Sequence, residues 1–290
     1  MTWPIEARLS RARGRAEVER AQRAAALAAR HENLAATTDN DTLRSFHAAI
    51  AATHRRIEER HTVTATLHQT YADRLALCDK ADQSSRSCAI PSFMASVATA
   101  LGSTGAAVTL VGETPEASVF ATSDTTAGAA QDLEYTYGEG PGRDAVRFGL
   151  TMAGHGQALC RRWPNYGPAI AELGVRSVAA TPLLVVDRPI GALTVFDSST
   201  EAPTELSGLE RLADALADTL LMDSAIPESM VLYGQVDVRP TVHQAVGMVA
   251  EQNGCGASDA LALIRAHAFS TDMPVTAVAE DVVARRVRLG

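Results

Sequence analysis

The hydrophobic and polar positions divide the 290-residue chain into three parts with different periodicities. Residues 1–83 are rich in alanine and arginine, two strong helix formers, and predict two helices. The acidic and amide side chains at residues 39–41 suit the N-cap of the second helix. Apolar residues recur there at alternating steps of three and four over residues 43–78, with two interruptions by arginine. This seam fits a helical hairpin packed on its own domain and a dimerising coiled coil equally well.

The central part, residues 84–224, alternates strand-like and helix-like runs. Short β-rich runs lie at 106–111, 118–122, 175–186 and 190–196, and helical patterns lie at 93–101, 168–173 and 206–221. A turn signal at residues 187–189 joins the last two strands. We therefore expect an α+β domain in which helices cover an antiparallel sheet.

The C-terminal part, residues 237–290, follows a linker at 225–236 and predicts three short amphipathic helices. The first ends at Asn253 and Gly254, a C-cap pair, and the third begins near Asp272 and Pro274. Their apolar positions follow helical spacing and predict the core Val242, Ala245, Val246, Val249, Ala260, Leu261, Ile264, Ala268, Val275, Val278, Ala279, Val282 and Val283. Because each helix is too short to stand alone, the three pack together or on a partner.

Composition and charge exclude several classes of protein. The formal net charge is −8, and no part of the chain has the basic excess that marks a nucleic-acid binder by charge alone. The single lysine, Lys80, excludes a P-loop. No run is apolar enough for a membrane span, and no secretory signal begins the chain. The cysteines are scattered without a C-x-x-C pair, which predicts neither a zinc site nor a disulfide framework and fits a reducing cytoplasm: Cys78, Cys88, Cys160 and Cys255.

Several motifs of the central part occur in an order that resembles a GAF domain. They are Tyr-Gly-Glu-Gly-Pro-Gly-Arg-Asp-Ala at 137–145, Gly-Val-Arg-Ser at 174–177, Pro-Leu at 182–183 and Gly-Ala-Leu at 191–193. The resemblance implies a sensory module that holds a small molecule between the sheet and its covering loops and helices. Tyr137, Asp144 and Trp163 are our candidate ligand-binding residues, because they combine aromatic surface with polar atoms. The cofactor, if any, stays unknown.

Two further features of this part keep alternative interpretations open. The amides around Gly138, Gly140 and Gly142 could face an anion such as a nucleotide phosphate, but their spacing is not G-x-G-x-x-G and also fits a tight structural turn. His155 and Cys160 flank a loop and could ligate iron or simply be loop residues. We assign no metal ligand.

The C-terminal helices carry a second resemblance. Val-His-Gln-Ala-Val-Gly-Met-Val at 242–249, the pattern Asp-Ala-Leu-x-Leu-Ile-Arg-x-His-Ala at 259–268, and the pairs Val-Ala at 278–279 and Val-Val at 282–283 are similar to an ANTAR domain. ANTAR domains are three-helix RNA-binding modules of transcription antiterminators. A sensory domain followed by ANTAR is an arrangement common in actinobacteria.

The ANTAR resemblance and the helix patterns together give candidate RNA-binding residues: Arg239, His243, Gln244, Gly247, Arg265 and His267. Arg265 follows the apolar-stripe residue Ile264, so we expect its side chain to point toward solvent. Val246 stands where the family usually has a lysine, which predicts the loss of one phosphate-contacting cation. Each of these polar side chains could equally be an ordinary solvated position on a helix face.

The sequence contains no nucleophile elbow, zinc-protease motif or paired catalytic carboxylates, so we expect no enzyme and assign no catalytic residue. The leading hypothesis is a cytoplasmic, dimeric regulator that senses a small molecule or partner through its central domain and binds hairpin RNA in a nascent transcript. The alternative is a sensory scaffold whose ANTAR-like tail has lost RNA affinity and contacts proteins. An enzyme that uses the glycine-rich loop is the third interpretation.

Overall fold

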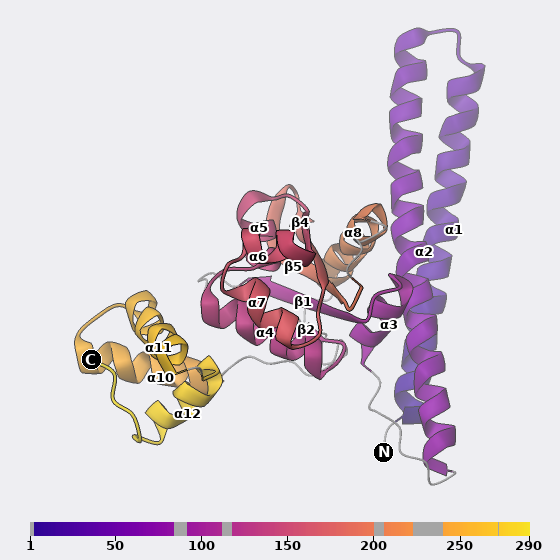
Figure 1. The fold of residues 1–290 in the computed structure, drawn as a ribbon. Helices are drawn as coiled ribbons and strands as arrows, with labels where there is room; N and C mark the ends of the chain where they lie inside the picture. Colours follow the sequence, from indigo (N-terminus) through magenta and orange to yellow (C-terminus); the bar gives the residue numbers. More distant parts are fainter. Residues whose placement is uncertain (1–2, 84–91, 112–117, 200–205, 223–239, 272) are drawn as a thin grey trace.

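The computed structural model describes residues 3–83, 92–111, 118–199, 206–222, 240–271 and 273–290 (Figure 1). The N-terminal part forms the two expected helices, α1 (Trp3–Thr37) and α2 (Asp41–Gln83), which lie side by side as a long antiparallel hairpin (Figure 1). The cysteine prediction was wrong at one position, because Cys78 on α2 is disulfide-bonded. Spacing along the chain does not reveal which cysteines pair in space. The cysteine pattern therefore does not indicate the cellular compartment.

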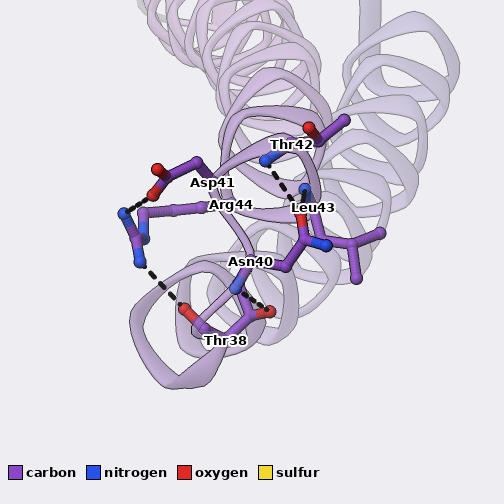
Figure 2. Close-up of polar contacts among 6 residues, drawn as sticks. All are labelled: Thr38, Asn40, Asp41, Thr42, Leu43 and Arg44. Carbon is purple, nitrogen blue, oxygen red and sulfur yellow. Dashed lines mark hydrogen bonds and ion pairs between the residues drawn. The ribbon is translucent and has the colours of Figure 1, made fainter.

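The hairpin turn is organised by the side chain of Asn40, as the N-cap signal predicts. Its Oδ1 atom accepts hydrogen bonds from the backbone N–H groups of Thr42 at 2.9 Å and Leu43 at 3.1 Å (Figure 2). Arg44 donates to Asp41 at 2.5 Å and to the carbonyl oxygen of Thr38 at 3.1 Å, which ties the first turn of α2 to the end of the loop. The cap satisfies two of the amides that a helix start leaves without an intrahelical partner.

Small side chains and a few polar pairs hold the two long helices together. Buried alanines let the helices approach closely along their contact: Ala7, Ala21, Ala24, Ala28, Ala51, Ala65 and Ala72. Across the pair, Ser10 donates to the carbonyl oxygen of His68 at 2.8 Å, and Arg55 makes two 2.8 Å hydrogen bonds to Glu32. The polar pairs fix the register of an interface that apolar packing alone would leave loosely defined.

The apolar seam of α2 does not form one continuous interface. Leu67 and Tyr71 are buried, because this part of the helix packs against the central domain. Leu43 and Phe46, near the hairpin turn, are 48% and 57% exposed. The single heptad pattern thus covers two different environments.

The central part contains a five-stranded antiparallel sheet with strand order β2-β1-β5-β4-β3. The strands are β1 (Gly105–Val111), β2 (Ser118–Thr122), β3 (Met152–His155), β4 (Ser177–Val185) and β5 (Arg188–Asp197). A turn joins the last two strands as expected, but it lies at Val186 and Asp187, with φ angles of 47° and 62°, and residues 188–189 already belong to β5.

Helices cover both faces of the sheet. One face packs on α2, α3 (Phe93–Ala100) and α8 (Leu206–Met222). The other face packs on α4 (Thr125–Tyr137), α5 (Pro141–Phe148), α6 (Gly156–Arg162) and α7 (Tyr166–Glu172). Alternate strand residues divide between the two cores, so Ala106 and Val108 belong to one and Ala107 to the other.

The sequence predictions missed α4, α5, α6 and β3. The side chain of Asp124 caps α4 and Gly138 ends it in a left-handed conformation, a pair of signals that marks this helix.

The C-terminal part is the expected three-helix bundle of α10 (Pro240–Asn253), α11 (Ala257–Thr271) and α12 (Val275–Val283). All predicted core positions are buried except Val283, which is partly buried. Gly254 adopts the left-handed conformation expected after α10, with φ of 62°. Pro274 is the N-cap of α12, and the predicted cap signal at Asp272 lies outside the described residues. Across the described part of the chain, no helix is both long and apolar enough to traverse a bilayer.

Candidate functional site

The outer face of α10 borders a groove that brings two of the six RNA-binding candidates together with two arginines. The groove has a volume of about 650 Å³ and is lined by Gln244, Gly247, Met248, Glu251, Gln252, Val282, Arg285, Val287 and Arg288. Gln244 and Gly247 come from one exposed side of α10, and the two arginines come from the segment after α12. His243 is also exposed on α10 but does not line the groove. The groove therefore joins two amide side chains, one carboxylate and two cations on one surface.

The end of α12 explains why the arginines differ from one another. Arg285 follows the last helical turn with a positive φ of 58°, and its N–H bonds to the carbonyl oxygen of Val282 at 2.9 Å. Arg286 is held by Asp281 at 2.6–2.7 Å, so its charge is partly neutralised within the bundle. Arg285 and Arg288 are exposed at the groove and can meet a phosphate backbone.

Two neighbouring positions on α10 have opposite environments. A Cβ atom added at Gly247 would meet no atom within 4 Å, so the backbone is open to an approaching ligand at this point. Val246 is only 6% exposed and belongs to the bundle core. Because this face of α10 packs on the other helices, the side chain at position 246 serves the bundle core in this chain.

Of the candidates on α11, Arg265 does not point freely into solvent as expected. Its guanidinium carbon lies 4.5 Å from the ring centroid of Tyr135, which belongs to α4 of the central domain. His267 is partly buried, and its carbonyl oxygen accepts the hydroxyl hydrogen bonds of Ser270 and Thr271. Arg239 lies outside the described residues. The structure thus separates the α11 candidates from those that line the groove.

A second concave site lies inside the central domain, between the sheet and helices α4 and α5. This cavity of about 340 Å³ is lined by Thr109, Val111, Phe120, Gln131, Glu134, Tyr135, Gly138, Gly142, Arg143, Asp144, Val146, Arg147 and Ala192. Of the three candidate ligand-binding residues, only Asp144 lines it. Trp163 is buried in the core and donates its indole N–H to Asp144 at 3.0 Å. Tyr137 lies outside the lining and packs on Phe269 of α11.

The carboxyl group of Glu134 is the chemically unusual group of this cavity. Its Oε1 atom accepts the backbone N–H of Arg143 at 2.7 Å, and the Gly142 N–H also bonds to it. Burial raises the pKa of Glu134 to about 7, although the amide hydrogen bonds and the charge of Arg143 act in the opposite direction. The side chain can therefore exchange a proton near neutral pH. The sequence gives no sign of this, because the shift arises from desolvation.

Glu134 also settles what the glycine-rich loop faces. A Cβ atom added at Gly140, whose φ is 156°, would come within 2.7 Å of the Glu134 carboxyl carbon. The amides of Gly142 and Arg143, in the first turn of α5, face the chain's own Glu134 carboxyl group.

A larger cleft of about 800 Å³ lies between α2, α8 and the sheet, and the sequence predictions missed it. Its lining includes apolar residues such as Val63, Leu101 and Val195 and charged residues such as Arg55 and Arg211. It is the space left where the long helix α2 packs across the domain. His155 is exposed and Cys160 is half-buried, and the described residues contain no group of three or more metal-ligating side chains.

Comparison with known proteins adds one finding. Residues 232–283 match the family described as the ANTAR domain, a range that spans α10, α11 and α12. No curated protein matches the chain. The match confirms the resemblance of the C-terminal helices. The C-terminal bundle is thus an ANTAR domain, and this domain implies RNA-binding antitermination regulation in general.

Proposed function

We propose that the protein regulates transcription antitermination by binding a hairpin RNA in a nascent transcript through its C-terminal bundle. The ANTAR match carries this proposal. The exposed side of α10 and the adjacent arginines supply the contact surface, with Gln244 reaching base edges and Arg285 and Arg288 meeting phosphates. The proposal assigns no catalytic activity to the chain and places its action in the cytoplasm.

The test is RNA binding by matched arginine variants of the full chain. Crosslinking and sequencing of RNA bound in cells identifies the hairpin, and gel-shift titrations at several salt concentrations measure affinity. Arg285→Gln and Arg288→Gln should each weaken binding and reduce the salt slope by about one contact. Arg286→Gln removes the same charge from an arginine that Asp281 already holds, so it is the control.

The alternative function is a sensory scaffold that contacts proteins rather than RNA. The missing lysine at position 246 favoured this alternative, but Val246 is buried in the bundle core. Valine at this position therefore serves the packing of the bundle, and RNA binding decides between the two functions. Failure of the wild-type chain to bind any RNA recovered from cells would leave the scaffold as the better explanation.

We also propose that the central domain is a GAF-like sensor for a small molecule of mixed polar and apolar character. The cavity of about 340 Å³ between sheet and helices supports this, since it combines the Phe120 ring with the carboxyl group of Glu134. A ligand that binds the folded domain raises its stability, by ~2.7 kcal/mol at a hundredfold excess over the dissociation constant. A metabolite screen by thermal shift tests this, and Ala192→Phe, which fills the cavity, should abolish any stabilisation found.

We further propose that a second copy of the chain covers the end of the helical hairpin. Leu27 and Leu34 on α1 and Leu43 and Phe46 on α2 are each 39–57% exposed near the turn. Burying such residues between two hairpins would form a four-helix bundle. Light scattering of Leu43→Glu/Phe46→Glu should give the monomer mass. Point substitutions are used because α2 also forms part of the core of the central domain, which a deletion of the hairpin would disrupt. An unchanged dimer mass would move the interface elsewhere.

A further inference from the structure

Helix α4 of the central domain contacts the ANTAR bundle through its last turns. Tyr135 is 7% exposed and belongs to the same buried cluster as the core residues of α10, α11 and α12. Its ring also lies under the guanidinium group of Arg265, with 4.5 Å from the guanidinium carbon to the ring centroid. An aromatic ring at this distance attracts a cation and covers one face of it.

A second aromatic contact joins the same two helices. Tyr137 of α4 and Phe269 of α11 meet edge to face, with ring centroids 5.9 Å apart and an interplanar angle of 81°. This geometry is the favoured one for aromatic pairs. Phe269 nevertheless stays 60% exposed, so the contact is limited in area and can open without unfolding either domain.

The same helix also faces the cavity of the central domain. Gln131 and Glu134 line the cavity, and Tyr135 contributes both to its lining and to the bundle contact. Helix α4 therefore connects a space that can hold a small molecule to a surface that holds Arg265.

We propose that α4 is an autoinhibitory docking surface for the ANTAR bundle. In the docked arrangement Tyr135 covers Arg265, an RNA-binding candidate that lies outside the α10 groove. The proposal extends the RNA contact from the groove to that side of α11, where RNA competes with α4. This inference rests on the proposed RNA-binding function. The apparent dissociation constant for RNA equals the intrinsic constant divided by the undocked fraction, so weakening the docking contact strengthens RNA binding.

The test measures hairpin RNA affinity for full-length variants. Tyr137→Ala changes only the central domain, and it removes an aromatic contact whose loss shifts the docking equilibrium about fivefold. We expect RNA binding that is up to about fivefold tighter for this variant. Phe269→Ala removes the same contact from the bundle side and should have an effect of similar size. Phe148→Ala is the matched control, because this exposed aromatic residue of α5 contacts Arg147 and not the bundle.

Small-angle scattering of the same variants separates the two proposals. Release of the bundle should increase the radius of gyration of the Tyr137→Ala/Phe269→Ala double variant relative to Phe148→Ala. An unchanged radius overturns the docking contact, and release with unchanged or weaker RNA binding overturns the inhibition. If neither the wild type nor any variant binds RNA, the proposed RNA function fails, while the scattering result still decides whether the docking contact exists.

Discussion

Replacing the buried carboxyl group of Glu134 by the neutral amide in Glu134→Gln should remove a pH-dependent cost to the stability of the central domain. The ordinary pKa of a glutamate is 4.5, and burial raises that of Glu134 to about 7 in the folded protein. At ~1.4 kcal/mol per pH unit, ionising this group costs about 3 kcal/mol more in the folded than in the unfolded chain. Between about pH 4.5 and 7, Glu134 binds a proton in the folded chain more often than in the unfolded chain. The free energy of unfolding therefore decreases as pH rises through this range.

The measurement is urea unfolding from pH 4.5 to 8, followed by the fluorescence of buried Trp163 in a Trp3→Phe background. The quantity to compare is the free energy of unfolding of Glu134→Gln minus that of the parent, which should increase by about 3 kcal/mol across this range. The difference is needed because burial lowers the pKa of His68 to about 4, which destabilises the fold as pH falls below 6.5. Glu172→Gln, at an exposed position of α7, controls for removing one charge from the same domain. A difference that stays constant with pH would refute the reasoning.

Three further substitutions test other parts of the structure. Gly247→Ala should stabilise the bundle by about 0.5–1 kcal/mol in thermal unfolding, since nothing lies near its added methyl group, and should weaken RNA binding in a gel shift if RNA approaches the backbone there. Unaltered affinity would argue against that close approach. Val246→Lys should destabilise the bundle by about 1–3 kcal/mol in chemical unfolding because it places a cation in the core. A stable variant with tighter RNA binding would contradict the core position. Asn40→Ala should cost about 1 kcal/mol in thermal unfolding followed by circular dichroism, through loss of the cap bonds. An unchanged melting curve would show that the cap is not needed.

The sequence alone determined the features that depend on neighbours close in the chain. The apolar spacing in α10, α11 and α12 identified the bundle core, and Asn40 and Gly254 marked where helices begin or end. Local patterns suffice here because a helix places residues three and four apart on one face. The same patterns missed α4, whose weak apolar stripe is hidden among glycine, threonine and acidic residues.

Only the tertiary structure decided the environment of the functional groups. The position of Arg265 off the apolar stripe was apparent from the sequence, but the ring of Tyr135 that covers it comes from a different domain. The spacing of the glycine-rich segment left open whether it faces an anion or forms a structural turn, and the structure places the Glu134 side chain against it. In both cases the deciding neighbour is brought in by packing, and the raised pKa of Glu134 depends on how much water that packing removes.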